Sequence, residues 1–391
     1  MSVISIERIE TWACSLPMET PLDFGTFKVV SREYVAVRLT TSDGMVADCL
    51  VLSRRSPIDV AIADVLAPLV IGKPASDIAA RASDLANGTR ALDQYGVINR
   101  GRSILDICLW DISAQKDGVP LWRKLGGRPR KLDVLLVEGY SLPGVSDDAF
   151  AERLAARVRD DGFRNLKIEG ASYRDPGQLA ARLREFRRIA GDQAGLVVDL
   201  AWSWPDAATG VKAIAAWKEF GLLWVEDPMT RDKVDEIAML RKRSGVPIGV
   251  GDETTNPAEL DRLMDADALD LVRVDALAIG GISAAMAVAQ RAMAKGIAVS
   301  MHEHPELHEH LAFAIDTCRY VEAFPLDRPF VRSHDLLRRS TMQRVERSQL
   351  SPPTLPGTGI SLDDEALRRF SYRRHAVSAA AAPSLLSNVV R

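Results

Sequence analysis

The feature that most restricts the possible folds of this chain is a repeated alternation of short apolar segments with amphipathic helical segments, which begins near Asp133. Helical segments such as AFAERLAARVRDDG and GQLAARLREFRRIAG separate the apolar ones, and Gly or Pro usually closes each of them. The apolar segments predict strands and are DVLLVEGY, NLKIEG, GLVVDL, LLWVED, PIGVGD, LDLVRVD, IAVSMH and RYVEAF. Eight βα units in about 200 residues predict a closed parallel (β/α)₈ barrel of the TIM-like type.

An open, doubly wound sheet is the main structural alternative, because it also alternates strands with helices. Such a sheet usually carries a glycine-rich phosphate loop. Neither GxGxxG nor GxxxxGK[ST] occurs in the sequence: GVGDET lacks the final glycine, and AIGGIS follows the wrong kind of element. The barrel is therefore the favoured prediction.

The part of the chain before the barrel predicts a separate α+β domain. Residues 2–14 and 34–52 carry alternating or β-branched runs, and the second run contains a Ser-Asp-Gly turn that suggests a hairpin. From about 57 to 117 the apolar period becomes helical. A chain of 391 residues also exceeds the usual size of a single core. We expect a capping domain over 1–128, a barrel over 129–330, and a segment over 331–391 that returns to the capping domain.

The composition restricts the classes of partner and compartment. Apolar residues make up 47% of the chain and charged residues 26%, and the formal net charge is only -3. This balance suggests neither a nucleic-acid partner nor a membrane partner. The N-terminal residues include acids where a signal peptide would be basic, so we expect a cytoplasmic protein. The four cysteines lack CxxC spacing and predict buried free thiols rather than disulfides or zinc ligands.

Three acidic residues end consecutive predicted strands, and they are Asp199, Glu226 and Asp252. Functional groups of a parallel barrel lie at the C-terminal ends of its strands. Neighbouring strands are roughly 4.8 Å apart, so three carboxylates at this level converge on a point that a cation would stabilise. Any one of them alone could be a solvated residue or a helix N-cap. Together they predict an all-oxygen site that favours Mg²⁺ over zinc.

The ends of other predicted strands add further ionisable residues. Lys167 belongs to the second strand, Asp275 ends the sixth, His302 ends the seventh and Glu322 belongs to the eighth. Asp275 and His302 would be neighbours, and a carboxylate beside an imidazole makes the ring a better general base. A substrate at the metal would have Lys167 on one face and His302 on the other.

Together, these segments resemble the mandelate racemase branch of the enolase superfamily, the mandelate racemase/muconate lactonizing enzyme family. The resemblance covers nearly the whole chain, through SILDICLWDISAQKDGVPLWRKLGG, GFRNLKIEG, VVDL, WVEDP, PIGVGDE, VRVDALAIGGIS, VSMHEHPELHEHL and YVEAF. It implies that Asp199, Glu226 and Asp252 bind one Mg²⁺ ion. The ion in turn binds a substrate carboxylate while a base removes the α-proton to give an enediolate.

The resemblance also assigns roles to the remaining strand-end residues. His302 with Asp275 matches the histidine-aspartate dyad, and Glu322 matches the acid that hydrogen-bonds the substrate carboxylate. A small-molecule carboxylate is therefore the expected partner, and a homo-oligomer is expected because relatives commonly assemble.

The sequence departs from the family pattern at three positions. The second Lys of the Lys-x-Lys motif is replaced by Glu169, a possible substrate contact, so the usual second base is missing. Ala201 stands where many relatives have Asn. On the fifth strand, a slight bulge would present Glu253 in place of Asp252 as the third metal ligand.

Several further residues are candidates for substrate contacts. In the family the segment at about 17–31 is a lid, so Phe24 and Lys28 are candidate lid contacts, or else ordinary hairpin residues. Trp202 either walls the pocket or packs beneath it. His304 is a candidate for binding substrate hydroxyls. The histidines that follow His302 also allow a zinc site, against which we favour a polar loop.

The missing second base decides the predicted reaction. A racemase needs a base on each face of the substrate, whereas a dehydratase can use His302 alone to remove the α-proton and return it to the departing β-hydroxyl. We therefore favour Mg²⁺-dependent dehydration of a hydroxy acid or sugar acid. An epimerase or cycloisomerase that uses Lys167 as the second base, and a metal-binding homologue with decayed catalysis, are the alternatives.

Overall fold

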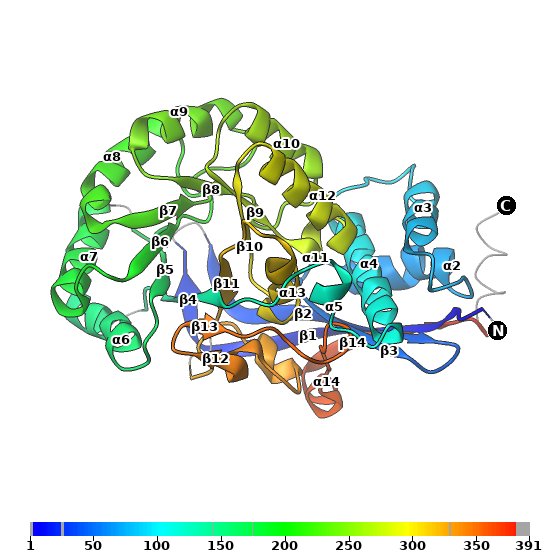
Figure 1. Ribbon diagram of the computed structural model, residues 1–391. Coiled ribbons are helices and arrows are strands. Elements are labelled where there is room, and N and C mark those ends of the chain that lie inside the picture. Colours follow the sequence, from blue (N-terminus) through cyan, green and yellow to red (C-terminus); the bar gives the residue numbers. More distant parts are fainter. Residues whose placement is uncertain (1–2, 25–26, 143, 174, 328–329, 381–391) are drawn as a thin grey trace.

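A computed structural model of the protein describes residues 3–24, 27–142, 144–173, 175–327 and 330–380. It contains a four-stranded antiparallel sheet with associated helices and a barrel of parallel strands covered by helices (Figure 1). None of the helices in this part of the chain combines the length and the apolarity needed to cross a membrane.

The antiparallel sheet has the strand order β14-β1-β2-β3. Its strands are β1 (Ile6–Asp23), β2 (Lys28–Thr41), β3 (Val46–Leu52) and β14 (Ser371–Ser378). The pairing of β14 with β1 brings residues from the end of the chain into the sheet formed at its beginning. Its helical partners are α1 (Ile58–Val60), a π-helical segment (Ala61–Leu66), α2 (Ala67–Val70), α3 (Ile78–Gly88), α4 (Val97–Lys116) and α5 (Leu121–Lys124). All four cysteines are buried free thiols, as expected.

The segment at about 17–31, which carries the candidate lid contacts, extends this sheet. Pro17 pairs with Ser31 and Leu22 pairs with Val29, with a register shift between the two pairs. The strands therefore continue outward as a long hairpin, of which residues 25–26 lie outside the described residues. Met18, Leu22 and Phe24 pack against Phe330, so this hairpin reaches the chain that follows the last barrel strand.

Eight parallel strands form the barrel, in agreement with the predicted fold (Figure 1). They are β4 (Leu132–Gly139), β5 (Asn165–Glu169), β6 (Gly195–Asp199), β7 (Leu222–Glu226), β8 (Ile248–Val250), β9 (Leu271–Val274), β10 (Ala298–Met301) and β11 (Tyr320–Ala323). Each strand from β4 to β9 pairs with the next, and β11 pairs with β4. Their side chains are mostly buried, which explains why the strands appear as apolar runs in the sequence.

Helices follow the first seven barrel strands, and several begin at a polar N-cap. They are α6 (Asp147–Arg159), α7 (Pro176–Ala190), α8 (Ala207–Trp217), α9 (Val234–Ser244), α10 (Pro257–Asp265), α11 (Ala276–Ile279), α12 (Gly281–Ala294) and α13 (Pro305–Ala314). Ser146, Asp175, Asp206 and Asn256 each accept a backbone hydrogen bond at a helix start. Such caps fix where each helix begins, and therefore where each preceding loop lies at the barrel mouth.

The chain after β11 differs from the eighth βα repeat that the sequence predicts. In the described part of this segment, β12 (Val345–Glu346) and β13 (Gln349–Leu350) form a small hairpin, and β13 pairs antiparallel with β4. Helix α14 (Asp364–Phe370) then leads into β14. The segment thus joins the barrel to the antiparallel sheet.

Candidate active site

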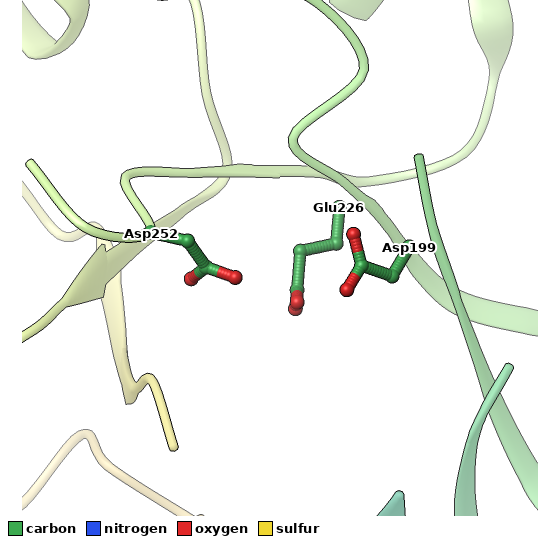
Figure 2. Close-up of side chains that lie close together, drawn as sticks. All are labelled: Asp199, Glu226 and Asp252. Atoms are coloured by element: carbon green, nitrogen blue, oxygen red, sulfur yellow. The ribbon is translucent and has the colours of Figure 1, made fainter. Parts of the chain in front are cut away.

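Three carboxylates from adjacent strand ends meet at the mouth of the barrel. Asp199 ends β6, Glu226 ends β7, and Asp252 follows β8. One oxygen of each lies within 4.8 Å of one oxygen of each of the others. Figure 2 shows the three groups side by side, with Glu226 between the two aspartates. The parallel register places Asp199 beside Glu226, because each is the last residue of its strand.

Two buried cations contact the same carboxylates. Lys167 Nζ forms an ion pair with Glu226 and lies 3.2 Å from Asp199 Oδ2. Arg273 Nε lies 3.1 Å from Glu226 Oε2 and 2.8 Å from Asp252 Oδ1. Burial opposes the charge on Lys167, but the nearby carboxylates outweigh this effect and raise its pKa well above the ordinary value.

The donor set and the formal charges of this cluster suit a divalent cation. Its ligands are all carboxylate oxygens, which hard cations such as Mg²⁺ prefer. Four carboxylates, those of the triad and of Glu322, face two cations, Lys167 and Arg273. The formal imbalance of two negative charges is what one Mg²⁺ ion would neutralise. The three carboxylates therefore form a site suitable for Mg²⁺.

The backbone after β8 presents Asp252 to this cluster and turns Glu253 away. Gly251 has φ +141, and a Cβ there would lie 2.2 Å from the carbonyl oxygen of Arg273, so only glycine fits. Asp227 accepts hydrogen bonds from the amides of Gly251 and Asp252, both at 2.9 Å, which fixes the turn. No local sequence pattern indicates that role for Asp227.

Glu253 is bound instead by two arginines. Its Oε1 accepts from Arg54 at 2.6 Å and its Oε2 accepts from Arg100 at 2.9 Å. Burial opposes its ionised form, but the two guanidinium groups lower its pKa to about 2. Of the two residues considered for the third ligand position, the geometry therefore favours Asp252.

His302 follows β10 and lies beside the carboxylate cluster. Its Nδ1 is 3.3 Å from Asp275 Oδ2, and its Nε2 is 3.7 Å from Asp252 Oδ2. The other oxygen of Asp275 accepts from the amide of Leu277 at 2.9 Å, so the carboxylate is held in place. Burial opposes the imidazolium form, but Asp252 and Asp275 outweigh it and raise the pKa of His302 to about 10. The predicted dyad is thus brought together.

Both carboxylate oxygens of Glu322 accept hydrogen bonds from groups of the protein. Its Oε1 accepts from Lys167 at 2.8 Å and from Arg273 at 2.6 Å, and its Oε2 accepts from the amide of Glu303 at 2.7 Å. Burial opposes ionisation, but Arg273 and Lys167 lower its pKa. An ionised carboxylate accepts hydrogen bonds, so this geometry does not fit the predicted hydrogen bond from Glu322 to a substrate carboxylate.

Glu169 lies outside the cavities at the barrel mouth. Its Oε1 accepts from the amide of Ser172 at 2.9 Å and its Oε2 accepts from the Ser172 hydroxyl at 2.8 Å. Burial raises the pKa of Glu169 to about 7. The residue that replaces the second lysine therefore stabilises a turn, and the structure does not support a substrate contact for it.

Two adjoining cavities lie at the barrel mouth, and the inner one reaches the carboxylates. The inner one has a volume of about 50 Å³ and is lined by Asp199, Asp252, Lys167 and His302, among others. The outer one has a volume of about 560 Å³, within the range typical of small-molecule sites. Both are lined by Phe27, Arg32, Arg54, Trp202 and Glu253.

The four predicted substrate contacts outside the barrel strands have different positions. Trp202 lines both cavities, and Phe24 lines the inner one. Lys28 lines the outer one, but its side chain is 69% exposed and pairs with Asp23. His304 lines neither cavity. Its Nε2 instead accepts a hydrogen bond from the amide of Leu52 at 3.3 Å, and the structure therefore does not support the predicted contact of His304 with substrate hydroxyls.

The histidines after His302 are structural, and the expected polar loop is wrong. His308 and His310 are buried in α13. His308 Nε2 accepts from the amide of Ala276 at 3.0 Å, and His310 Nδ1 accepts from the amide of Trp122 at 3.2 Å. Each ring nitrogen of both residues has a backbone partner, which leaves no free nitrogen for zinc.

Sequence reasoning missed Arg273 and Arg32. Arg273 is a charged residue in an otherwise apolar strand, two residues before Asp275. Residues two apart on a strand face the same side, so this position could have been predicted to face inward. Arg32 lies on β2 in another domain, and no local pattern places it at the barrel mouth.

Comparison with known sequences identifies two domains in the chain. Residues 8–126 match the mandelate racemase / muconate lactonizing enzyme N-terminal domain, and residues 149–366 match the enolase C-terminal domain-like family. The L-talarate/galactarate dehydratase of Salmonella typhimurium is 26% identical over 303 residues, which are 78% of this chain and 73% of that enzyme. The D-galactarolactone cycloisomerase of Agrobacterium fabrum is 25% identical over 388 residues, covering 94% of this chain and 99% of that enzyme.

Solved structures agree with the fold. A crystal structure of L-talarate/galactarate dehydratase from Salmonella typhimurium LT2, liganded with Mg and L-lyxarohydroxamate, has a TM-score of 0.87 at 22% identity and covers 96% of this chain and 95% of that one. The relatives thus share one architecture but carry the names of different reactions.

Proposed function

Because this chain belongs to the mandelate racemase/muconate lactonizing enzyme family, and is thus an enzyme of the enolase superfamily, we propose that it removes the proton α to a carboxylate and dehydrates a hydroxy acid or sugar acid. The product would be a 2-keto-3-deoxy acid. The observation that carries this proposal is that one histidine-aspartate dyad faces the cavity, while the position of the usual second base holds Glu169, which is bound to Ser172.

Asp199, Glu226 and Asp252 would hold the Mg²⁺ ion. When bound there, the ion would supply Lewis acidity that makes the α-proton of a coordinated carboxylic acid easier to remove. Lys167 lines the inner cavity and carries donors that can hydrogen-bond the substrate carboxylate. Arg273 lies behind the triad and keeps its carboxylates in position.

His302 would act twice in the reaction. In its neutral form, Nε2 takes the α-proton, and Asp275 stabilises the imidazolium that results. The same imidazolium then gives this proton to the β-hydroxyl, the Cβ–O bond breaks, and water leaves. The electron pair left by the α-proton forms the carbon–carbon double bond of an enol, which tautomerises to the 2-keto acid. One base on one face is sufficient for both transfers.

An epimerase needs a second base on the opposite face of the substrate. Lys167 is the remaining candidate, but its ammonium group contacts Glu226, Glu322 and Asp199. A lysine held in this way is suited to donate hydrogen bonds. Its surroundings therefore favour a binding role, and with it the dehydratase over the epimerase or cycloisomerase.

The proposal is tested by incubating the protein and Mg²⁺ with a panel of aldonic and aldaric acids and measuring 2-keto-3-deoxy products as semicarbazones. The expected result is product from at least one acid, none with excess EDTA, and at least about 100-fold slower product formation with His302→Asn. Ser172→Ala, which changes a partner of Glu169 outside the cavities, is the matched control and should retain activity. Failure to form a keto acid across the panel, or turnover that His302→Asn leaves unchanged, would contradict the proposal.

A further inference from the structure

Arg32 is a buried cation at the barrel mouth, and it forms no ion pair within the described part of the chain. Its residue is 3% exposed, and its Nε donates to the carbonyl of Phe330 at 2.6 Å. Among the described residues, no Asp or Glu forms an ion pair with its guanidinium group. The residues outside that description include no Asp or Glu side chain either. The terminal nitrogens of Arg32 therefore lack an Asp or Glu partner among the residues that the structure describes.

The other basic residues of the cavity walls are paired. Arg54 contacts Glu253 at 2.6 Å, and Arg55 contacts Glu33 at 3.2 Å. Burial of an unpaired charge is strongly unfavourable, so buried cations are normally found with a counter-ion. Arg32 is thus set up to receive an anion that the chain itself does not supply.

The location of Arg32 indicates where that anion comes from. Arg32 lines both the inner cavity, which contains the carboxylate triad, and the larger outer cavity. A substrate whose reacting carboxylate lies at the triad would extend past Arg32 on its way outward.

Two further polar groups near this path are unsatisfied. The indole Nε1 of Trp202 and the Oε1 of Glu303 are buried, and neither has a hydrogen-bond partner among the described residues. Both residues line the inner cavity. A donor and an acceptor of this kind suit the hydroxyl groups of a polyhydroxy acid.

We infer that the substrate is a dicarboxylic hydroxy acid, whose second carboxylate binds the guanidinium group of Arg32 while its hydroxyls meet Trp202 and Glu303. This inference rests on the proposed function, which places the first carboxylate at the triad. An arginine can donate two parallel hydrogen bonds to a carboxylate. A neutral hydroxymethyl group cannot accept this pair of bonds. The enzyme should therefore distinguish an aldaric acid from the aldonic acid of the same configuration.

The experiment compares kcat/KM for the matched pairs galactarate and galactonate, glucarate and gluconate, and arabinarate and arabinonate, in the wild type, Arg32→Met and Arg32→Lys. The wild type should prefer one dicarboxylate over its monocarboxylate by about tenfold or more. Arg32→Met should lower kcat/KM for that dicarboxylate by roughly 100-fold, mainly through KM, with little effect on monocarboxylates. Arg32→Lys should recover part of the preference. Arg291→Met, which removes an exposed and paired arginine outside both cavities, is the matched control.

Stability separates this role from a structural one. Since Arg32 forms no ion pair among the described residues, Arg32→Met loses only the hydrogen bond to the Phe330 carbonyl and should unfold within a few degrees of the wild type. A preference for monocarboxylates, or equal loss for both substrate classes in Arg32→Met, would overturn the inference and leave the proposed function intact. If Arg32→Met does not fold, equal dicarboxylate preference in Arg32→Lys and the wild type would overturn it.

Binding of adipate, an unreactive six-carbon dicarboxylate, separates the inference from the proposed function. With Mg²⁺ present, calorimetry should detect adipate binding that Arg32→Met weakens, and weaker binding of hexanoate. If no acid is turned over but adipate binds in this Arg32-dependent manner, the proposed function fails and the anion site stands. Adipate binding that is unaffected in Arg32→Met would overturn the inference.

Discussion

Replacing Arg273 by methionine tests how the carboxylates at the barrel mouth are held together. The guanidinium group is 0% exposed and contacts Asp252 at 2.8 Å and Glu322 at 2.6 Å, with Glu226 at 3.1 Å. Removing one partner of a buried ion pair costs about 3–5 kcal/mol, because the remaining charge is left uncompensated. Lys167 still contacts the same acids, so we expect the lower value, about 3 kcal/mol, which corresponds to a fall in Tm of roughly 4 °C.

The assay is thermal unfolding of Arg273→Met and the wild type in EDTA and in saturating MgCl₂. Removal of the positive charge of Arg273 makes the net charge of the site more negative by one. Mg²⁺ should therefore bind the variant more tightly and restore part of the lost stability. Arg291→Met is the matched control, because its ion pair with Asp261 is on the surface and should contribute less than about 1 kcal/mol. If Arg273→Met in EDTA lost no more stability than Arg291→Met, or if Mg²⁺ restored none of it, Arg273 would not be what holds these carboxylates together.

Three further substitutions have expected outcomes that can be measured directly. His302→Asn should lower kcat by about 10²–10⁴-fold while calorimetry finds Mg²⁺ affinity close to that of the wild type; normal turnover would exclude the residue as the base. Asp252→Asn should weaken Mg²⁺ binding and Glu253→Gln should not, and the reverse order would identify Glu253 as the ligand. Burial raises the pKa of Asp111 to about 7 from 3.8, so its contribution to stability is lost as the pH rises from about 4 to 7. Asp111→Asn should therefore gain in Tm relative to the wild type over this range and level off above it, and a pH-independent difference would contradict this.

The barrel and its carboxylate triad could be predicted because both depend on local sequence. Strands buried on both faces appear as apolar runs, and a parallel barrel places the ends of consecutive strands side by side. Asp199 and Glu226 could therefore be predicted as ligands once two strands had been assigned correctly. Asp252 required one more fact, the backbone turn at Gly251, which a sequence pattern does not show.

Contacts between distant segments could not be predicted in the same way. Arg54 and Glu253 are 199 positions apart, and their pairing depends on how the capping domain lies on the barrel. Arg32 reaches the cavity for the same reason. Glu169 was identified as a departure, but whether it faces the cavity depends on the turn that contains Ser172.

The His302 segment illustrates a different limit. The run of histidines appeared polar and exposed, yet α13 buries His308 and His310 against backbone groups that complete their hydrogen bonds. Burial of a polar side chain depends on partners elsewhere in the fold, which composition does not reveal.

The most direct test of the one-sided chemistry is the reaction of an active acid with Mg²⁺ in D₂O, followed by NMR of both the product and the remaining substrate. Dehydration by a single base should give a 2-keto-3-deoxy acid with deuterium at C3 and no epimer of the substrate. Recovery of an epimer with deuterium at the α-carbon, without loss of water, would contradict it.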